Sequence, residues 1–187
     1  MLRSGAVKVD LAGSVFEDLL ALHDEFMSIV DRLADADLLW RYGRREGALL
    51  IVLVAVAATA QRTFPGIKGD RAAFEAFMRT THDWTIAVEH RGEAVDIDHL
   101  FYKWMRCELV HKGSLPPDVR IDENFPDPMA CGVRAGGEPE YTVLLSPGWY
   151  SFLTSAVCMA PVNAGLRFRP AQPPKIGQRG GRAQPHS

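Results

Sequence analysis

Arg106 and His111 are the residues of this chain best suited to metal-independent chemistry on a phosphate. A guanidinium stays charged and binds phosphate through a planar fork, so it can stabilise the charge that develops on phosphoryl oxygens. An imidazole titrates near neutrality and can move the proton of a 2′-hydroxyl. The two side chains therefore form a candidate catalytic pair for RNA cleavage.

The spacing of this pair leaves two interpretations open. On an ideal α-helix, side chains five positions apart point about 140° away from each other, so Arg106 and His111 need not meet within one helix. A second copy of the chain could supply the facing group and complete a cleft. The alternative is structural: a surface arginine, and a histidine whose positive charge complements the dipole at the end of its helix.

Tyr102 and Lys112 are candidate substrate-binding residues beside the pair. Tyr102 lies one helical turn before Arg106, so it could orient the guanidinium or stack on a base. Lys112 could add a contact to a phosphate. The structural alternatives are a half-buried aromatic side chain and a solvated lysine.

These four residues lie on a helix that we predict over residues 98–113, with both ends marked. Asp98 is of the N-cap type, and Gly113 can adopt the left-handed conformation that ends many helices. The apolar residues between them recur on one stripe, which predicts a buried face. They are Leu100, Phe101, Trp104, Met105 and Leu109.

The stretch Arg106-Cys-Glu-Leu-Val-His111 fits the Arg-x4-6-His motif of HEPN domains, and Tyr102 to Gly113 resembles the motif helix of bacterial HEPN-like proteins. HEPN domains are small helical bundles, and many are dimeric ribonucleases of toxin and defence systems. The resemblance covers residues 98–113 by motif and residues 1–113 by architecture. Cys107 differs from the polar residue, commonly Asn or Asp, that often follows the arginine in active members.

The resemblance implies a metal-independent endoribonuclease, in which Arg106 and His111 are catalytic and no cofactor is needed. It also implies a homodimer, RNA as the substrate and an antitoxin protein as a partner. Two other hypotheses stay open: a non-catalytic HEPN-like module that binds a nucleotide or a protein in the same cleft, and a helical protein unrelated to this family.

The cysteines and histidines give no metal-site pattern. Cys107 and His111 are four residues apart and could form half of a metal site or a thiol–imidazole pair. The remaining cysteines and histidines lack a CxxC or HxxxH spacing, so we expect no metal. Three cysteines without paired spacing also imply no disulfide framework and favour the reducing cytoplasm.

Periodicity predicts three helices before the motif. They span residues 14–39, 46–63 and 71–83, the last with Asp70 as its cap. The second is apolar nearly all round and too short for a membrane span, so we expect it in the centre of a bundle or in a dimer interface. Residues 89–95 are expected to form a loop.

Beyond Gly113 the pattern changes to short strands, predicted over residues 119–122 and 140–145 and joined by a segment rich in proline and glycine. Ser146 and Pro147 are expected to cap and begin a last helix. The predicted fold is therefore mostly α: a HEPN-like bundle of four to five helices with a small β-hairpin before the last helix.

Composition favours one ordinary globular domain, because 47% of the 187 residues are hydrophobic and 24% are charged. We expect this domain over residues 1–166 and a disordered, basic, Pro- and Gly-rich tail over residues 167–187. The tail carries five cations and no acid, which leaves a charge of −7 on the rest of a chain whose net charge is −2. We expect no signal peptide, since polar residues interrupt the N-terminal apolar run. We also expect no membrane association, since the most apolar stretch is too short to span a membrane.

Overall fold

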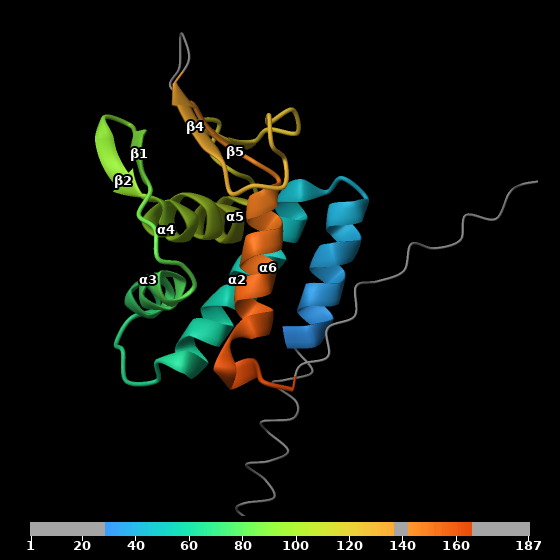
Figure 1. The fold of residues 1–187 in the computed structure, drawn as a ribbon, viewed down its shortest axis with the longest axis vertical. Coiled ribbons are helices and arrows are strands. Elements are labelled where there is room, and N and C mark those ends of the chain that lie inside the picture. Colours follow the sequence, from blue (N-terminus) through green and yellow to red (C-terminus); the bar gives the residue numbers. More distant parts are fainter. Residues whose placement is uncertain (1–28, 137–141, 166–187) are drawn as a thin grey trace, which may run out of the picture.

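The computed structural model of the protein describes residues 29–136 and 142–165, and helices make up most of this part (Figure 1). The mostly α prediction is therefore confirmed. A first helix is described over residues 29–41. Residues 14–28 of the predicted first helix and the predicted tail lie outside the described residues.

Helix α2 (Arg45–Thr63) runs through the middle of the fold, as its apolar sequence predicts. Helix α3 (Asp70–Thr80), helix α6 (Gly148–Met159) and the helix that carries the Arg-x4-His sequence pack against it. The first helix adds Leu33 and Ala36 to the same buried cluster. Because neighbours surround α2, apolar residues on all of its sides find cover.

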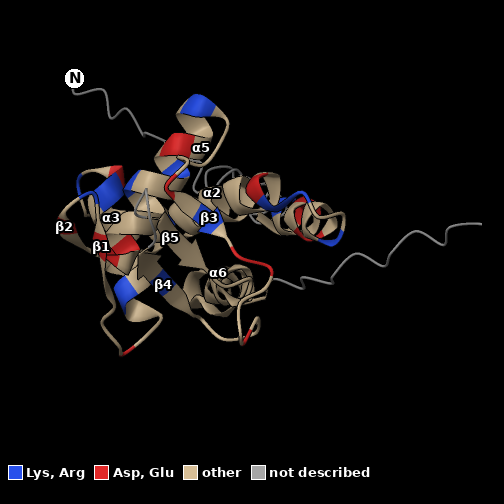
Figure 2. Cartoon of the chain, turned by 90° about the horizontal axis from the view of Figure 1, so that it is seen from above, with Lys and Arg blue, Asp and Glu red and all other residues tan. Residues whose placement is uncertain are grey.

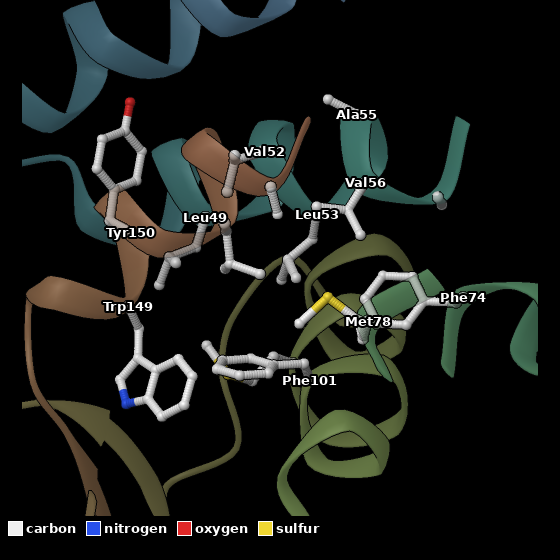
Figure 3. Packing of buried hydrophobic residues seen from close by; sticks show 14 of the residues in the cluster. Leu49, Val52, Leu53, Ala55, Val56, Phe74, Met78, Phe101, Trp149 and Tyr150 are labelled. Atoms are coloured by element: carbon white, nitrogen blue, oxygen red, sulfur yellow. The ribbon is translucent and has the colours of Figure 1, made fainter. Parts of the chain in front are cut away.

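By length and composition alone, α2 could also cross a membrane, and half of its most apolar window is buried inside the protein. Figure 3 shows Phe74 and Met78 of α3 near Leu53 and Val56 of α2, and Phe101 beside Trp149 of α6. Phe74, Met78 and Phe101 are fully buried, which places the centre of the core at this contact.

One continuous helix over residues 97–112, called the motif helix below, contains all four predicted site residues. It consists of α4 (Ile97–His99), a π-helical stretch η1 (Leu100–Arg106) and α5 (Cys107–Lys112). Gly113 ends it with a φ of 77°, so the predicted left-handed end is confirmed.

The beginning of the motif helix corrects the predicted cap. The Asp96 carboxylate, one residue before the helix, accepts the backbone N–H of Asp98 at 2.9 Å. Asp98 is itself within the helix and fully buried, so its prediction as the N-cap is wrong. The prediction for α3 fails in the same way: Gly69 is the cap, and Asp70 is the first helical residue.

The predicted loop over residues 89–95 is a β-hairpin instead. Strands β1 (Ala87–His90) and β2 (Glu93–Asp96) pair antiparallel, and Arg91 and Gly92 turn between them with φ of 55° and 81°. Two positive φ values match the tight turns that suit the twist of a hairpin. Arginine is not a residue that signals such a turn, which explains the wrong prediction.

The second sheet also differs from the prediction. Strands β3 (Val119–Ile121) and β5 (Thr142–Leu145) are the two predicted strands, but they pair in parallel and do not form a hairpin. Strand β4 (Val133–Gly136), from the segment expected as a loop, pairs antiparallel with β5 and gives the order β3-β5-β4. The hairpin before the last helix is therefore β4–β5.

Ser146 binds the loop before β4 and does not cap α6. Its hydroxyl donates to the Ala130 carbonyl and accepts the Gly132 N–H at 2.9 Å. No side-chain hydrogen bond caps α6, and Pro147 precedes it with helical dihedral angles. Gly148 allows the start of α6 to lie close to the backbone of the loop at Ala130. A Cβ at this position would lie 2.3 Å from the Ala130 carbonyl oxygen. The short turn η2 (Pro161–Asn163) follows α6.

Candidate functional site

Arg106 and Tyr102 lie together and share one partner on α3. Nη1 of Arg106 is 2.8 Å from the Asp70 carboxylate, and the Tyr102 hydroxyl donates to the same oxygen at 3.3 Å. The guanidinium carbon lies 5.4 Å from the centre of the Tyr102 ring, which is a cation–π distance. The structure therefore brings these two predicted residues together and adds Asp70, which the sequence did not indicate.

The Arg106 guanidinium and the Tyr102 hydroxyl are both partly buried. The Arg106 side chain is 20% exposed, and its Nε is buried without a hydrogen-bond partner among the described residues. Burial and the charge of Asp70 raise the pKa of Tyr102, so its hydroxyl stays protonated and donates. Asp70 thus holds the guanidinium in one orientation and offsets part of its charge.

His111 lies apart from Arg106 within the chain. It is exposed on α5, and no contact joins it to Arg106 in the described part of the structure. The segment from Cys107 onward is regular α-helix, so the separation of about 140° holds. Lys112 is 67% exposed at its side chain and pairs with Glu108 at 2.6 Å.

An exposed apolar residue lies between Arg106 and His111 on the surface of α5. Val110 is 47% exposed. Around the helix axis it lies about 40° from Arg106, in the direction of His111. Cys107, a free thiol that is partly exposed, lies in the same sector. Figure 2 shows this end of the motif helix projecting from the body of the fold, with acidic and basic residues upon it.

The N-terminal half of the motif helix is held by one part-buried and one buried polar pair. His99 Nδ1 lies 2.8 Å from Glu75 of α3, and His82 Nε2 lies 3.2 Å from Asp98 Oδ1. Burial raises the pKa of Asp98, and the hydrogen bond from His82 opposes this shift. The sequence showed these residues only as scattered histidines and acids.

A second polar cluster joins the β1–β2 turn to Asp118. The Arg91 guanidinium binds the Asp118 carboxylate at 2.6 and 2.9 Å and lies 4.1 Å over the Trp104 ring. His90 is buried beside them, with Nε2 3.1 Å from Asp118. Burial lowers the pKa of His90, although the negative charge of Asp118 opposes this shift. The hydrogen bond with Arg91 lowers the pKa of Asp118. This cluster fastens the hairpin to the motif helix.

Within the described residues, no group of three His, Cys, Asp or Glu side chains is placed to hold a metal ion. Cys107, Cys131 and Cys158 are free thiols, and burial raises the pKa of Cys131 and Cys158. A raised pKa makes a thiol a poorer nucleophile at neutral pH.

The fold and the site define a mostly α domain, built around one central apolar helix, whose motif helix is anchored at one end and exposed at the other. The chain belongs to the Rv1289 family, because the model of that family matches residues 28–170. No curated protein and no solved structure matches the chain significantly.

Proposed function

We propose that the protein is a HEPN-like, metal-independent endoribonuclease whose catalytic site forms between two copies of the chain. The observation that carries this proposal is the surface of α5, where exposed Val110 separates Arg106 from His111. Neither residue can complete a catalytic pair within its own chain. An exposed apolar group between them is what a contact with a second copy would cover.

Two-fold symmetry explains how this surface could become a site. An interface between identical patches is self-complementary, so each contact occurs twice. Suppose that the two-fold axis lies in the plane of the interface, passes near Val110 and runs at right angles to the line from Arg106 to His111. Rotation about this axis then places His111 of the partner subunit opposite Arg106. The same operation builds a second, identical site.

In this site, His111 takes the proton of a 2′-hydroxyl, whose oxygen then attacks the adjacent phosphorus. The bond from phosphorus to the 5′ oxygen breaks, the leaving oxygen takes a proton from water, and His111 returns its own proton to the solvent. The product ends in a 2′,3′-cyclic phosphate. Arg106 stabilises the charge on the phosphoryl oxygens, and Asp70 keeps the guanidinium in place. Tyr102 supports the Arg106 side chain, and Lys112 contacts the substrate backbone.

Mixing two inactive variants tests this arrangement. Arg106→Ala and His111→Ala should each fail to cleave RNA in the presence of EDTA, because every site in either homodimer lacks one group. After co-refolding, about half of the dimers are mixed and each contains one intact site, so about a quarter of the activity returns. Cys107→Ser is the matched control and should cleave RNA at the wild-type rate. If mixed dimers form and stay inactive, the shared site is wrong.

A second function is favoured by the ion pair between Arg106 and Asp70. An arginine already paired with a carboxylate suits a fixed binding surface, so the alternative is a non-catalytic HEPN-like module that binds a nucleotide or a protein. The alternative predicts that the wild-type protein leaves RNA intact under the conditions of the cleavage assay. RNA that is cleaved by wild type and left intact by His111→Ala would exclude it.

A further inference from the structure

A small pocket of about 200 Å³ lies where the end of α3, the segment before β1 and the first turn of the motif helix meet. Its walls include His82, Trp84 and Asp98. This volume is below the range of about 300–1,000 Å³ that is usual for drug-sized ligands. The pocket therefore suits a group of only a few heavy atoms.

Two residues that line this pocket each carry a buried polar atom without a hydrogen-bond partner among the described residues: Asp98 Oδ2 and His82 Nδ1. The side chains are 1% and 6% exposed, and both line the pocket. An unpaired polar atom that is buried costs free energy, so such atoms usually mark a missing partner. Two of them in one pocket indicate a ligand that bonds to both.

The hydrogen-bonding character of the two atoms defines that ligand. An ionised carboxylate only accepts, so the short contact with Asp98 Oδ1 places the proton of His82 on Nε2. Nδ1 is then an acceptor, as is Asp98 Oδ2. A pocket that presents two acceptors needs a ligand with at least two N–H or O–H donors.

The charges of the walls favour a cation among such donors. Asp83 and Asp96 add two carboxylates to that of Asp98. Arg79 also lines the pocket and its positive charge lowers the pKa of Asp98, but its side chain is 60% exposed and its guanidinium lies 3.7 Å from Glu75. Burial raises the pKa of Asp98, and a bound cation would oppose this shift.

We propose that this pocket binds a small primary alkylammonium ion. The ammonium donates to Asp98 Oδ2 and His82 Nδ1, and its third N–H faces the carboxylates at the mouth. The Trp84 ring, stacked on His82 at 3.7 Å between ring centres, supplies an aromatic wall for the alkyl chain. The site is independent of the proposed ribonuclease activity, because none of its residues lies on α5.

A titration of the full chain with n-butylammonium chloride at constant ionic strength tests the site, with the imidazole nitrogen shifts of His82 as the readout. We expect a saturating shift, because the ligand bonds directly to Nδ1. n-Butanol lacks the charge and butyltrimethylammonium lacks the N–H donors, so neither should produce it. A response that does not saturate, or that is the same for all three compounds, overturns the proposal.

Two variants give the same test by calorimetry. Asp98→Asn should weaken n-butylammonium binding by at least about tenfold, since a hydrogen bond to a charged group is lost. Glu108→Gln removes a carboxylate from α5 and is the matched control, with unchanged affinity expected. If Asp98→Asn does not fold, the wild-type titration and its two control compounds decide alone.

Discussion

The two halves of the motif helix differ in how they are held, although one amphipathic pattern runs through both. In the N-terminal half, His99 and Asp98 are paired with Glu75 and His82, and the apolar stripe is buried. In α5, only Leu109 is buried. The first half is therefore part of the core, whereas the second half is largely exposed on the surface.

The π-helical geometry of η1 belongs to the anchored half. It extends over seven residues, whereas π-helical segments are mostly single-turn bulges and often lie at functional sites. His99, just before this stretch, and Tyr102 and Arg106 within it all reach carboxylates of α3, namely Glu75 and Asp70. The π-helical stretch thus ends at Arg106, one residue before the exposed half begins.

The largest expected effect is on activity at the exposed end. His111→Ala should lower RNA cleavage by about 10²–10⁴-fold, which is the usual contribution of a general acid or base. Its unfolding free energy should change by no more than about 0.5 kcal/mol, because the side chain is exposed. Gel assays of cleavage and urea unfolding measure the two quantities. A variant that loses stability as well would show that His111 belongs to the anchored half.

A matched pair of core and surface substitutions comes next. Phe101→Ala should lower the free energy of unfolding by about 3–5 kcal/mol, because Phe101 is fully buried against α2 and Trp149. Val110→Ala, at a side chain that is 47% exposed, should cost less than about 1 kcal/mol. Urea denaturation of both variants measures the difference. Similar costs would contradict the division of the helix into two halves.

Charge placed on the exposed half should prevent self-association. Val110→Asp puts a carboxylate at the centre of the proposed interface, so we expect the dissociation constant of the dimer to rise by at least about tenfold. Light scattering at tens of micromolar protein measures the molecular mass. Asp127→Asn, on the exposed loop before β4, changes one charge away from α5 and serves as the control. A wild-type protein that is monomeric under these conditions would count against the dimer itself.

The pH dependence of stability sharpens the account of the anchored half. Burial lowers the pKa of His90 below its ordinary value of 6.5, so the unfolded chain binds the proton more readily than the folded one. Stability should therefore be constant with respect to this group above a pH of about 6.5, and it should fall as the pH drops from about 6.5 toward the lowered pKa of His90. Thermal unfolding of wild type and His90→Gln compares the profiles, and the variant should lack this slope.

The smallest effect is expected at the last residue of α5. Lys112→Ala removes an exposed pair with Glu108, and pairs of this spacing contribute about 0.3–0.5 kcal/mol. If Lys112 contacts the substrate, the variant should bind RNA more weakly and with a reduced dependence on salt. A filter-binding series at several salt concentrations measures both properties. An unchanged salt dependence would leave Lys112 as a solvated residue.

Some contacts of the motif helix could be predicted from the sequence, and others could not. The shared face of Tyr102 and Arg106 follows from spacing along one helix, and the structure shows them in contact. Asp70 could not be assigned as their partner, because it lies 32 residues before Tyr102 and its sequence context indicates only a helix start. The pairing of His82 with Asp98 could not be predicted either, because the two residues are 16 positions apart and belong to different segments.

By itself, the sequence determined the central apolar helix and the end of the motif helix at Gly113. These features depend on residues a few positions apart, through side-chain periodicity and the backbone freedom of glycine. Only the tertiary structure decided the hairpin at Arg91, the parallel pairing of β3 with β5 and the partner of each buried polar group. Those choices depend on segments far apart in the chain, where contacts such as Arg91 with Asp118 outweigh local preference.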